Sequence, residues 1–308
     1  MSNHRLIRRE HFGIERKIVA NMTSESWETV PHAGGNYEPD ITEFWDAYVA
    51  LRKNPHWSDI TANTLLLFVI VQGLKACPEM NGHISFKRKS ADGKVEFYEN
   101  IDISIPMTLP VGITMTINIH GCERMSLRDM ADAIANARRR MEKTNFNEAM
   151  YEAALNNSLK LLRRGRVDVV LLRLFGAAFG KGKVPHLRGQ AKRDYYTIPE
   201  TERLTGRDIE QGTITVSNFG SLYRGAYAPP AFLEIIPPQI CVIGVGGMVE
   251  RPGCITTPDD KKEIAPRKYL PFNLLFDHRA LDYGDIVPFM KRLDEIFARP
   301  GNLSEWLL

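Results

Sequence analysis

An aspartate, a histidine and a second aspartate stand close together near the carboxyl end of the chain. Asp277 and His278 follow an apolar run over 269–276 that predicts a buried strand, and Asp282 comes four residues after the histidine. A histidine held at the end of a core strand can take or give a proton near neutral pH, because the unperturbed pKa of imidazole is about 6.5. The same short pattern also suits a histidine that is simply packed at a strand end, so both interpretations stay open.

The elements around this segment must hold the histidine in place. After Gly284, apolar residues recur at helical spacing over 286–297, which predicts an amphipathic helix directly behind the histidine segment. Helices are also expected over 14–22, 41–53, 58–76, 127–141, 148–164 and 167–179, and strands over 83–88, 95–98, 101–108, 113–119, 213–217 and 239–249. Residues 27–40 should be extended or looped, with Tyr37 available to a strand, and 249–268 should form a polar loop. We therefore expect an α/β fold, a two-layer sandwich in which a mixed β-sheet is covered by helices.

The composition narrows the class of protein. The chain has 308 residues, of which 44% are hydrophobic and 25% charged, which is ordinary globular composition and allows one large domain or two small ones; we expect a single domain over residues 1–308. A formal net charge of +3 is too small to indicate a nucleic-acid partner. Four cysteines without a Cys-x-x-Cys spacing favour a reducing compartment, with neither a disulfide framework nor a metal site. The first 15 residues lack an apolar signal core and no run of 18 apolar residues occurs, so a cytoplasmic protein is expected.

One segment, residues 145–207, differs in character from the rest. Between residues 160 and 193 the chain has ten Lys or Arg side chains and a single acid, Asp168. We therefore expect a basic helical insert at about 145–207. A basic helix with one apolar face can lie on an anionic membrane surface, although a solvated face packed on its own domain is the commoner outcome.

Further motifs extend over most of the chain. They are, in chain order, residues 15–20 (Glu-Arg-Lys-Ile-Val-Ala) with 29–32 (Thr-Val-Pro-His), 40–42 (Asp-Ile-Thr), 74–81 (Leu-Lys-Ala-Cys-Pro-Glu-Met-Asn), 101–105 (Ile-Asp-Ile-Ser-Ile), 212–220 (Gly-Thr-Ile-Thr-Val-Ser-Asn-Phe-Gly), 236–239 (Ile-Pro-Pro-Gln) with 243–246 (Ile-Gly-Val-Gly), and 277–282 (Asp-His-Arg-Ala-Leu-Asp). In this order, over about residues 15–300, the chain resembles the catalytic domain of the 2-oxoacid dehydrogenase dihydrolipoamide acyltransferases, and more distantly chloramphenicol acetyltransferase. One such motif would be weak, whereas this ordered set is hard to explain by chance.

The resemblance implies a chloramphenicol-acetyltransferase-like fold and a homotrimer or a multiple of it. It implies an acyltransferase that moves an acyl group directly between coenzyme A and a thiol or other acceptor, such as one on a lipoyl or other acyl-carrier protein. Coenzyme A would be a substrate, and neither a metal, a redox cofactor nor a covalent enzyme intermediate is expected.

The resemblance also suggests roles for the two best candidates. His278 would be the general base that takes the proton from the attacking thiol or hydroxyl. Ser217 would donate a hydrogen bond to the tetrahedral oxyanion. In the family, these two groups face each other across a subunit boundary. The competing interpretations are a packed histidine and a turn serine at a strand end.

Supporting roles fall to four further positions. Asp282 would hold an arginine and fix the local loop, with Arg16 at the family position and Arg8 as a rival. A surface ion pair is nearly as good an interpretation of Asp282, since such pairs are common and weak. Asn218 and Gly220 would shape the loop around the oxyanion site.

The sequence departs from the family pattern in three ways, and these departures suggest alternative functions. Tyr283 stands where the family has glycine directly after the motif aspartate, which could distort the turn that holds Asp282. The sequence shows no lipoyl domain or Ala/Pro linker, so no lipoyl group on this chain is expected. The segment 145–207 is longer and more basic than its family counterpart. The alternatives are a catalytically inactive trimeric scaffold, and a membrane-surface or carrier-docking protein that uses residues 160–193.

Overall fold

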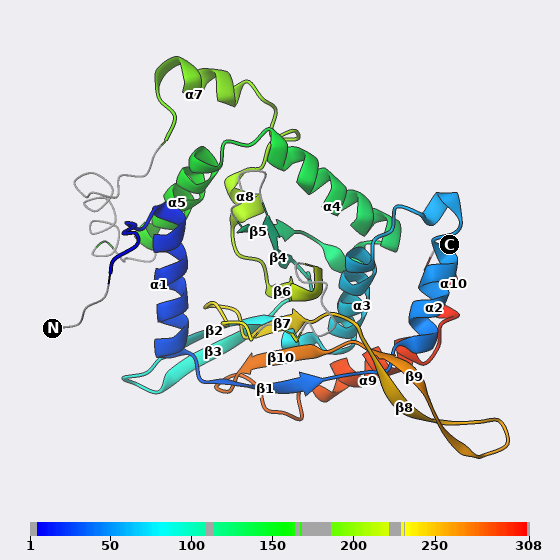
Figure 1. The fold of residues 1–308 in the computed structure, drawn as a ribbon. Coiled ribbons are helices and arrows are strands. Elements are labelled where there is room, and N and C mark those ends of the chain that lie inside the picture. The colour runs from blue at the N-terminus through cyan, green and yellow to red at the C-terminus, as the bar shows by residue number, and fades with distance from the viewer. Residues whose placement is uncertain are drawn as a thin grey trace.

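A mixed six-stranded sheet forms the centre of the molecule (Figure 1). The computed structural model describes residues 5–108, 114–163, 167, 186–221, 229–230 and 232–306. In sheet order the strands are β1 (His32–Tyr37), β10 (Phe272–Asp277), β7 (Cys241–Val245), β6 (Ile214–Asn218), β4 (Ile103–Thr108) and β5 (Thr114–Ile119). The neighbours β7, β6 and β4 run parallel, and the other pairings are antiparallel. The expected mixed sheet in an α/β fold is therefore confirmed.

Helices cover one face of this sheet and enclose the main hydrophobic core. The covering helices are α2 (Thr42–Leu51), α3 (Ala62–Ala76), α4 (Leu127–Glu142) and α9 (Val287–Phe297). The Thr61 hydroxyl accepts a hydrogen bond from Thr64 N at 3.1 Å and so caps the start of α3, which is buried along most of its length. A Cβ atom on Gly73 of α3 would lie 2.5 Å from Leu293 and 2.6 Å from Phe289 of α9. Glycine at this point therefore allows the two helices to approach closely.

The opposite face of the sheet is more polar. Alternate side chains along a strand point to opposite faces, and directly paired residues point to the same face. Ser217 of β6 is paired with Gly244, Gly244 with Asn273, and Asn273 with Asn36 of β1, so these residues form one row across the second face. A small apolar cluster of Val30, Ile235, Val242 and Leu275 covers part of the same face.

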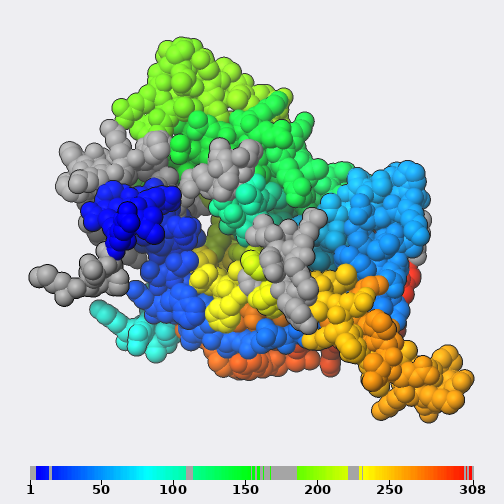
Figure 2. Space-filling model, in the orientation of Figure 1, coloured from blue at the N-terminus to red at the C-terminus, as the bar shows by residue number. Residues whose placement is uncertain are grey.

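The remaining elements surround this framework. They are α1 (Ile14–Thr29), the hairpin of β2 (Gly82–Lys87) and β3 (Asp92–Phe97), α5 (Phe146–Arg163), α7 (Gly189–Tyr196), α8 (Gly206–Ile209), the hairpin of β8 (Val249–Thr256) and β9 (Lys262–Tyr269), α10 (Asn302–Glu305), and the short 3₁₀ turns η1 (Pro55–Trp57), η2 (Pro78–Met80), η3 (Cys122–Arg124) and η4 (Phe219–Ser221). The β8–β9 hairpin projects from the body of the molecule (Figure 2). No helix within the described ranges is long and apolar enough to cross a membrane.

Several of the expected elements differ from those in the structure. The irregular chain expected over 249–268 is the β8–β9 hairpin, whose mostly exposed strands carry no apolar alternation that could reveal them. The single strand expected over 269–276 is divided between β9 and β10 around Pro271, which has no backbone N–H to continue a ladder. The first helix continues to Thr29, where the buried Ser26 hydroxyl donates to Ile235 O at 2.7 Å and ties the helix to a distant segment. The helix expected over 167–179 falls almost wholly outside the described residues.

Candidate active site

The imidazole of His278 is oriented by a backbone carbonyl. His278 follows β10, and its backbone N–H donates to Pro31 O at 3.0 Å. Its Nδ1 lies 3.2 Å from Leu281 O and 3.3 Å from a carboxylate oxygen of Asp282. A carbonyl oxygen can only accept a hydrogen bond, so Nδ1 carries the hydrogen and Nε2 keeps its lone pair. Nε2 has no hydrogen-bond partner in the described part of the chain, and the side chain is 45% exposed, so this nitrogen can act as a base.

A buried ion pair fixes the start of the same loop. The side chain of Asp277 is 0% exposed and accepts hydrogen bonds from Arg279 N and Nε at 2.9 Å and from its Nη2 at 2.5 Å. The Arg279 guanidinium also lies 5.3 Å from the ring centroid of Phe86. Backbone N–H groups of Ala280 and Leu281 donate to Asp277 O. Asp277 and Arg279 therefore position the segment that carries His278.

Ser217 lies in β6, near the other end of the sheet. Its side chain is half-buried, and its hydroxyl has no partner among the residues that the structure describes. The hydroxyl is therefore available to donate a hydrogen bond to a substrate oxygen.

Asn218 and Gly220 hold the chain directly after Ser217. Asn218 Nδ2 donates to Asn63 Oδ1 at 3.0 Å, which ties the end of β6 to the first turn of α3. A Cβ atom on Gly220 would lie 2.5 Å from Gly246 O, so only glycine allows the backbone to pass this close to the chain after β7. Both residues thus fix the course of the chain directly after Ser217.

The two main candidates do not meet within one chain. Ser217 is paired with Gly244 of β7, and Gly244 is paired with Asn273 of β10. His278 directly follows β10, five residues after Asn273. With strands about 4.8 Å apart and about 3.3 Å per residue along each strand, the two backbones are roughly 19 Å apart. Within one copy of the chain, His278 and Ser217 therefore lie toward opposite ends of the sheet.

The expected arginine partner of Asp282 is also absent within one chain. Arg16 lies in the first turn of α1, and the other end of this helix leads into β1. At a rise of 1.5 Å per residue, Arg16 is about 20 Å from that end, and α1 extends away from β10 (Figure 1). Arg8 pairs with Glu10 instead. Among the described residues, neither arginine contacts Asp282, which is 83% exposed and pairs with His278.

Tyr283 fits the turn without backbone strain. The non-glycine residues with positive φ in the described ranges are Ala91 and Asp260, so Tyr283 does not adopt the left-handed conformation that favours glycine. Asp282 N still donates to an Asp285 carboxylate oxygen at 2.7 Å. The distortion considered from the sequence is therefore not seen in this turn.

Three cysteine thiols are buried and poorly suited to act as nucleophiles. Burial raises the pKa of Cys77 to about 11 and that of Cys122 to about 12, and it raises the pKa of Cys241 well above its usual range. These thiols stay protonated near neutral pH, whereas the thiolate is the reactive form.

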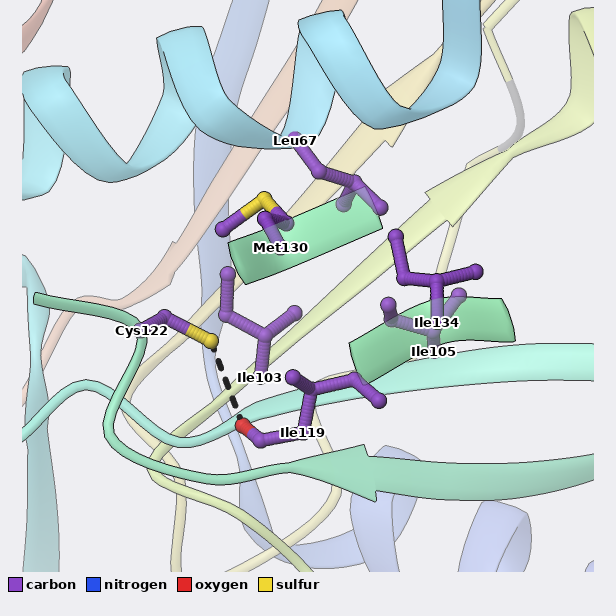
Figure 3. A pocket seen from close by; sticks show the side chains of 7 residues that line it. All are labelled: Leu67, Ile103, Ile105, Ile119, Cys122, Met130 and Ile134. Atoms are coloured by element: carbon purple, nitrogen blue, oxygen red, sulfur yellow. Dashed lines mark hydrogen bonds between the residues drawn. The ribbon is translucent and has the colours of Figure 1, made fainter. Parts of the chain in front are cut away.

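Two of the hollows in the described part of the chain lie elsewhere, and the first is too small to hold a water molecule. The first is lined only by apolar side chains and by Cys122, from α3, α4, β4, β5 and η3, and the Cys122 thiol donates to Ile119 O at 3.3 Å (Figure 3). The second, of about 300 Å³, lies beside β1, β8 and β9, where Arg251 pairs with Glu38. Neither is lined by His278 or Ser217, so both candidates stand apart from these hollows.

Several contacts at the site carry no signal in the sequence. The acceptor for His278 Nδ1 is the backbone oxygen of Leu281, and any residue type supplies such an oxygen. Asn63, which holds Asn218, belongs to no motif, and its position at the start of α3 is evident only once that helix is packed.

A family model of the 2-oxoacid dehydrogenases acyltransferase (catalytic domain) matches residues 5–154 and 190–305. The unmatched residues 155–189 lie inside the segment 145–207 in which an insert was expected. The acetyltransferase component of the pyruvate dehydrogenase complex of Mycoplasma capricolum is 24% identical over 288 residues, which are 94% of this chain and 50% of that protein. The Corynebacterium glutamicum counterpart is 22% identical over 91% of this chain and 32% of its own length. The chain thus spans half or less of these relatives.

Solved structures agree in fold. A probable dihydrolipoamide acetyltransferase from Listeria monocytogenes superposes with a TM-score of 0.62 at 20% identity, covering 95% of both chains. The cubic core of the pyruvate dehydrogenase multienzyme complex superposes with a TM-score of 0.62 at 19% identity, covering 98% of this chain and 95% of the other. The family resemblance read from the ordered motifs is confirmed: this chain belongs to the catalytic-domain family of the 2-oxoacid dehydrogenase acyltransferases.

Proposed function

We propose that this chain is a coenzyme-A-dependent acyltransferase that moves an acyl group between coenzyme A and a thiol acceptor. The observation that carries the proposal is the orientation of His278. Its Nδ1–H faces Leu281 O, so Nε2 is left basic and without a partner in the described chain, at an exposed loop. Ser217 supplies the complementary group, a half-buried hydroxyl that is also without a partner there.

The reaction needs one base and one oxyanion donor. Nε2 of His278 takes the proton from the acceptor thiol, and the sulfur then attacks the carbonyl carbon of the acyl thioester. The oxygen of the tetrahedral intermediate accepts a hydrogen bond from Ser217. When the intermediate collapses, the carbon–sulfur bond to coenzyme A breaks and the imidazolium returns its proton to the departing thiolate. The acyl group passes directly between the two sulfurs.

The site is completed by two copies of the chain. Ser217 and His278 lie roughly 19 Å apart in one copy by strand geometry, so His278 of one copy has to face Ser217 of another. We propose a homotrimer or a multiple of it, since a closed ring of copies repeats the same boundary. Self-association is supported by the fold shared with the cubic core of the pyruvate dehydrogenase complex.

A solved relative has residues of similar type and spacing whose part in catalysis has been investigated. In the dihydrolipoamide acetyltransferase of Azotobacter vinelandii, the roles of a serine, a histidine and an asparagine four residues after the histidine in the catalytic mechanism have been investigated. His278 and Asp282 have that spacing here, with aspartate in place of asparagine. We propose that Asp282 helps to orient His278, while Asn218 and Gly220 shape the loop after Ser217. Arg16 keeps a role only if a neighbouring copy brings it to Asp282.

Further proposals concern the extent of the domain, its insert, its substrates and its location. We propose a single acyltransferase domain over 1–308 with a basic insert at about 145–207, an acyl donor in acyl-coenzyme A, and an acceptor on a lipoyl or other carrier protein in the cytoplasm. Arg140 of α4 supports an insert that is tied to the domain, because its guanidinium donates to Arg203 O at 2.7 Å and to Glu200 O at 3.1 Å.

Activity is tested with a panel of acyl-coenzyme A thioesters, each with and without dihydrolipoamide and other thiol acceptors, by mass spectrometry of the products. The proposal predicts a new acyl thioester that depends on His278. If no thioester in the panel reacts while the chain is folded and assembled, the inactive scaffold becomes the better interpretation. Pelleting with anionic vesicles, compared with a chain lacking residues 160–193, tests the membrane-surface alternative.

The shared site is tested by mixing inactive chains. Ser217→Ala and His278→Ala chains are combined in equal amounts under conditions that exchange subunits. In a closed ring, about a quarter of the boundaries then regain both groups, and activity returns to about a quarter of the wild-type value. Mixing His278→Ala with a chain carrying both substitutions is the matched control, since no boundary regains both groups. No recovery despite proven exchange would contradict the shared site.

A further inference from the structure

The ring of Tyr283 packs against the proposed base. Its centroid lies 5.9 Å from that of the His278 imidazole and 5.2 Å from that of Phe276, and the planes meet at 83° and 84°. The Phe276 ring in turn lies 5.7 Å from the imidazole at 84°. The three rings therefore form one cluster of edge-to-face contacts, which is a favourable arrangement for aromatic rings.

Only one ring of this cluster is anchored in the core. Phe276 is 0% exposed, whereas Tyr283 is 56% exposed. The Tyr283 hydroxyl has no hydrogen-bond partner among the described residues, so ring packing, and not the phenol oxygen, holds the side chain in place. The turn also accepts tyrosine with an ordinary backbone conformation.

The imidazole is restrained by different groups on different sides. Leu281 O and Asp282 restrain it through Nδ1, while Phe276 and Tyr283 restrain the plane of the ring. A carbonyl at 3.2 Å fixes one atom but still allows the ring to tilt about that bond. The two aromatic contacts oppose such a tilt, and a general base has to be within hydrogen-bond reach of the proton it takes.

We propose that Tyr283 is a positioning residue for the acyl transfer, which acts through the ring of His278 and not through its own hydroxyl. The proposal rests on the proposed function of His278 as the base. Tyr283 thereby keeps Nε2 aimed at the incoming thiol in the interval before substrate is bound.

Two substitutions at one position test it. Tyr283→Ala removes the ring and should lower kcat about threefold to tenfold, the effect of losing one or two aromatic contacts of ordinary strength. KM for acyl-coenzyme A and the thermal unfolding midpoint should not change, because an exposed ring that orients the base contributes little to either. Tyr283→Phe keeps the ring and should retain wild-type kcat. Phe97→Ala, which removes another exposed aromatic side chain on β3, is the control and should be silent.

A second readout separates this inference from the proposed function. In histidine-labelled assembled protein, the ring protons of His278, assigned with His278→Ala, should show ring-current shifts in NMR spectra of the wild type and of Tyr283→Phe. These shifts should diminish in Tyr283→Ala. This measurement requires no turnover, so an inactive wild type would overturn the proposed function while the shifts still report the positioning. Wild-type kcat or unchanged His278 shifts in Tyr283→Ala would overturn the inference.

Discussion

The two ends of the central sheet are built in opposite ways. Directly after β10, the His278 imidazole contacts Leu281 O, the Asp282 carboxylate and two aromatic rings. The residues on either side of it, Asp277 and Arg279, form an ion pair whose carboxylate is buried. At the end of β6, the chain around Ser217 is fixed by backbone approach and by Asn218, yet the serine hydroxyl has no partner in the described structure. The proposed base is thus oriented within its own chain, while the proposed oxyanion donor has no partner among the described residues.

This difference has a physical explanation if, as proposed, His278 of one copy acts together with Ser217 of another. An imidazole has to present one nitrogen in one direction, so its orientation has to be set before substrate arrives. A hydroxyl rotates freely about its bond and needs only to lie within reach of the developing negative charge. In the proposed shared site, His278 is oriented within each chain, so the boundary between copies has only to bring Ser217 within hydrogen-bond reach of the substrate oxygen.

The sharpest test of the comparison is His278→Ala. Loss of a general base should lower kcat about 10²–10⁴-fold while assembly and folding are kept, because the exposed imidazole is not part of the core. The measurement is steady-state transfer on a verified substrate pair, with light scattering for assembly. His56→Ala, which removes an exposed histidine ring of η1, is the matched control and should be active. Wild-type turnover in His278→Ala would assign the base elsewhere.

Ser217→Ala tests the other end of the sheet. Removal of one oxyanion donor should lower kcat about 10²–10³-fold with little change in KM, because the hydrogen bond is strongest in the transition state. Kinetics over a range of both substrates separate the two parameters. Ser90→Ala, at the exposed turn between β2 and β3, should be without effect. A change confined to KM would instead place Ser217 in ground-state binding.

Asp277→Ala tests whether the base end depends on its buried pair. Breaking a buried ion pair costs about 3–5 kcal/mol, and because Arg279 is 23% exposed we expect the low end, about 3 kcal/mol. Urea unfolding measures this loss. Glu295→Ala, which breaks the exposed pair with Arg292, is the control and should cost at most about 1 kcal/mol. Equal losses of unfolding free energy in both variants would show that the Asp277–Arg279 pair stabilises the fold no more than an exposed ion pair does.

The smallest effect is expected for Asp282→Asn. The carboxylate is 83% exposed, and an exposed pair is worth up to about 1 kcal/mol, so kcat should fall by no more than about fivefold. Leu281 O still accepts from Nδ1 in this variant and keeps the imidazole oriented. A loss comparable to that of His278→Ala would mean that Asp282, and not the carbonyl, sets the orientation, or that a partner chain uses Asp282.

The sequence alone determined the family, the fold class and the main candidates. Apolar periodicity located α4 and α9, because each buries one face in the core, and a long apolar run located α3, which is buried on most sides. The ordered motifs located the candidates Ser217, Asn218, Gly220 and His278. The β8–β9 hairpin escaped prediction since its exposed strands have no buried face to give a period.

Only the tertiary structure decided how the candidates are arranged. Strand register, a property of backbone pairing, placed Ser217 and His278 at opposite ends of one sheet. The partner of Nδ1 is a backbone oxygen, which every residue carries, so no pattern of side chains could identify Leu281. The course of α1 separates Arg16 from Asp282 within one chain, because a rigid helix carries its first turn away from the sheet edge at which its last turn is anchored.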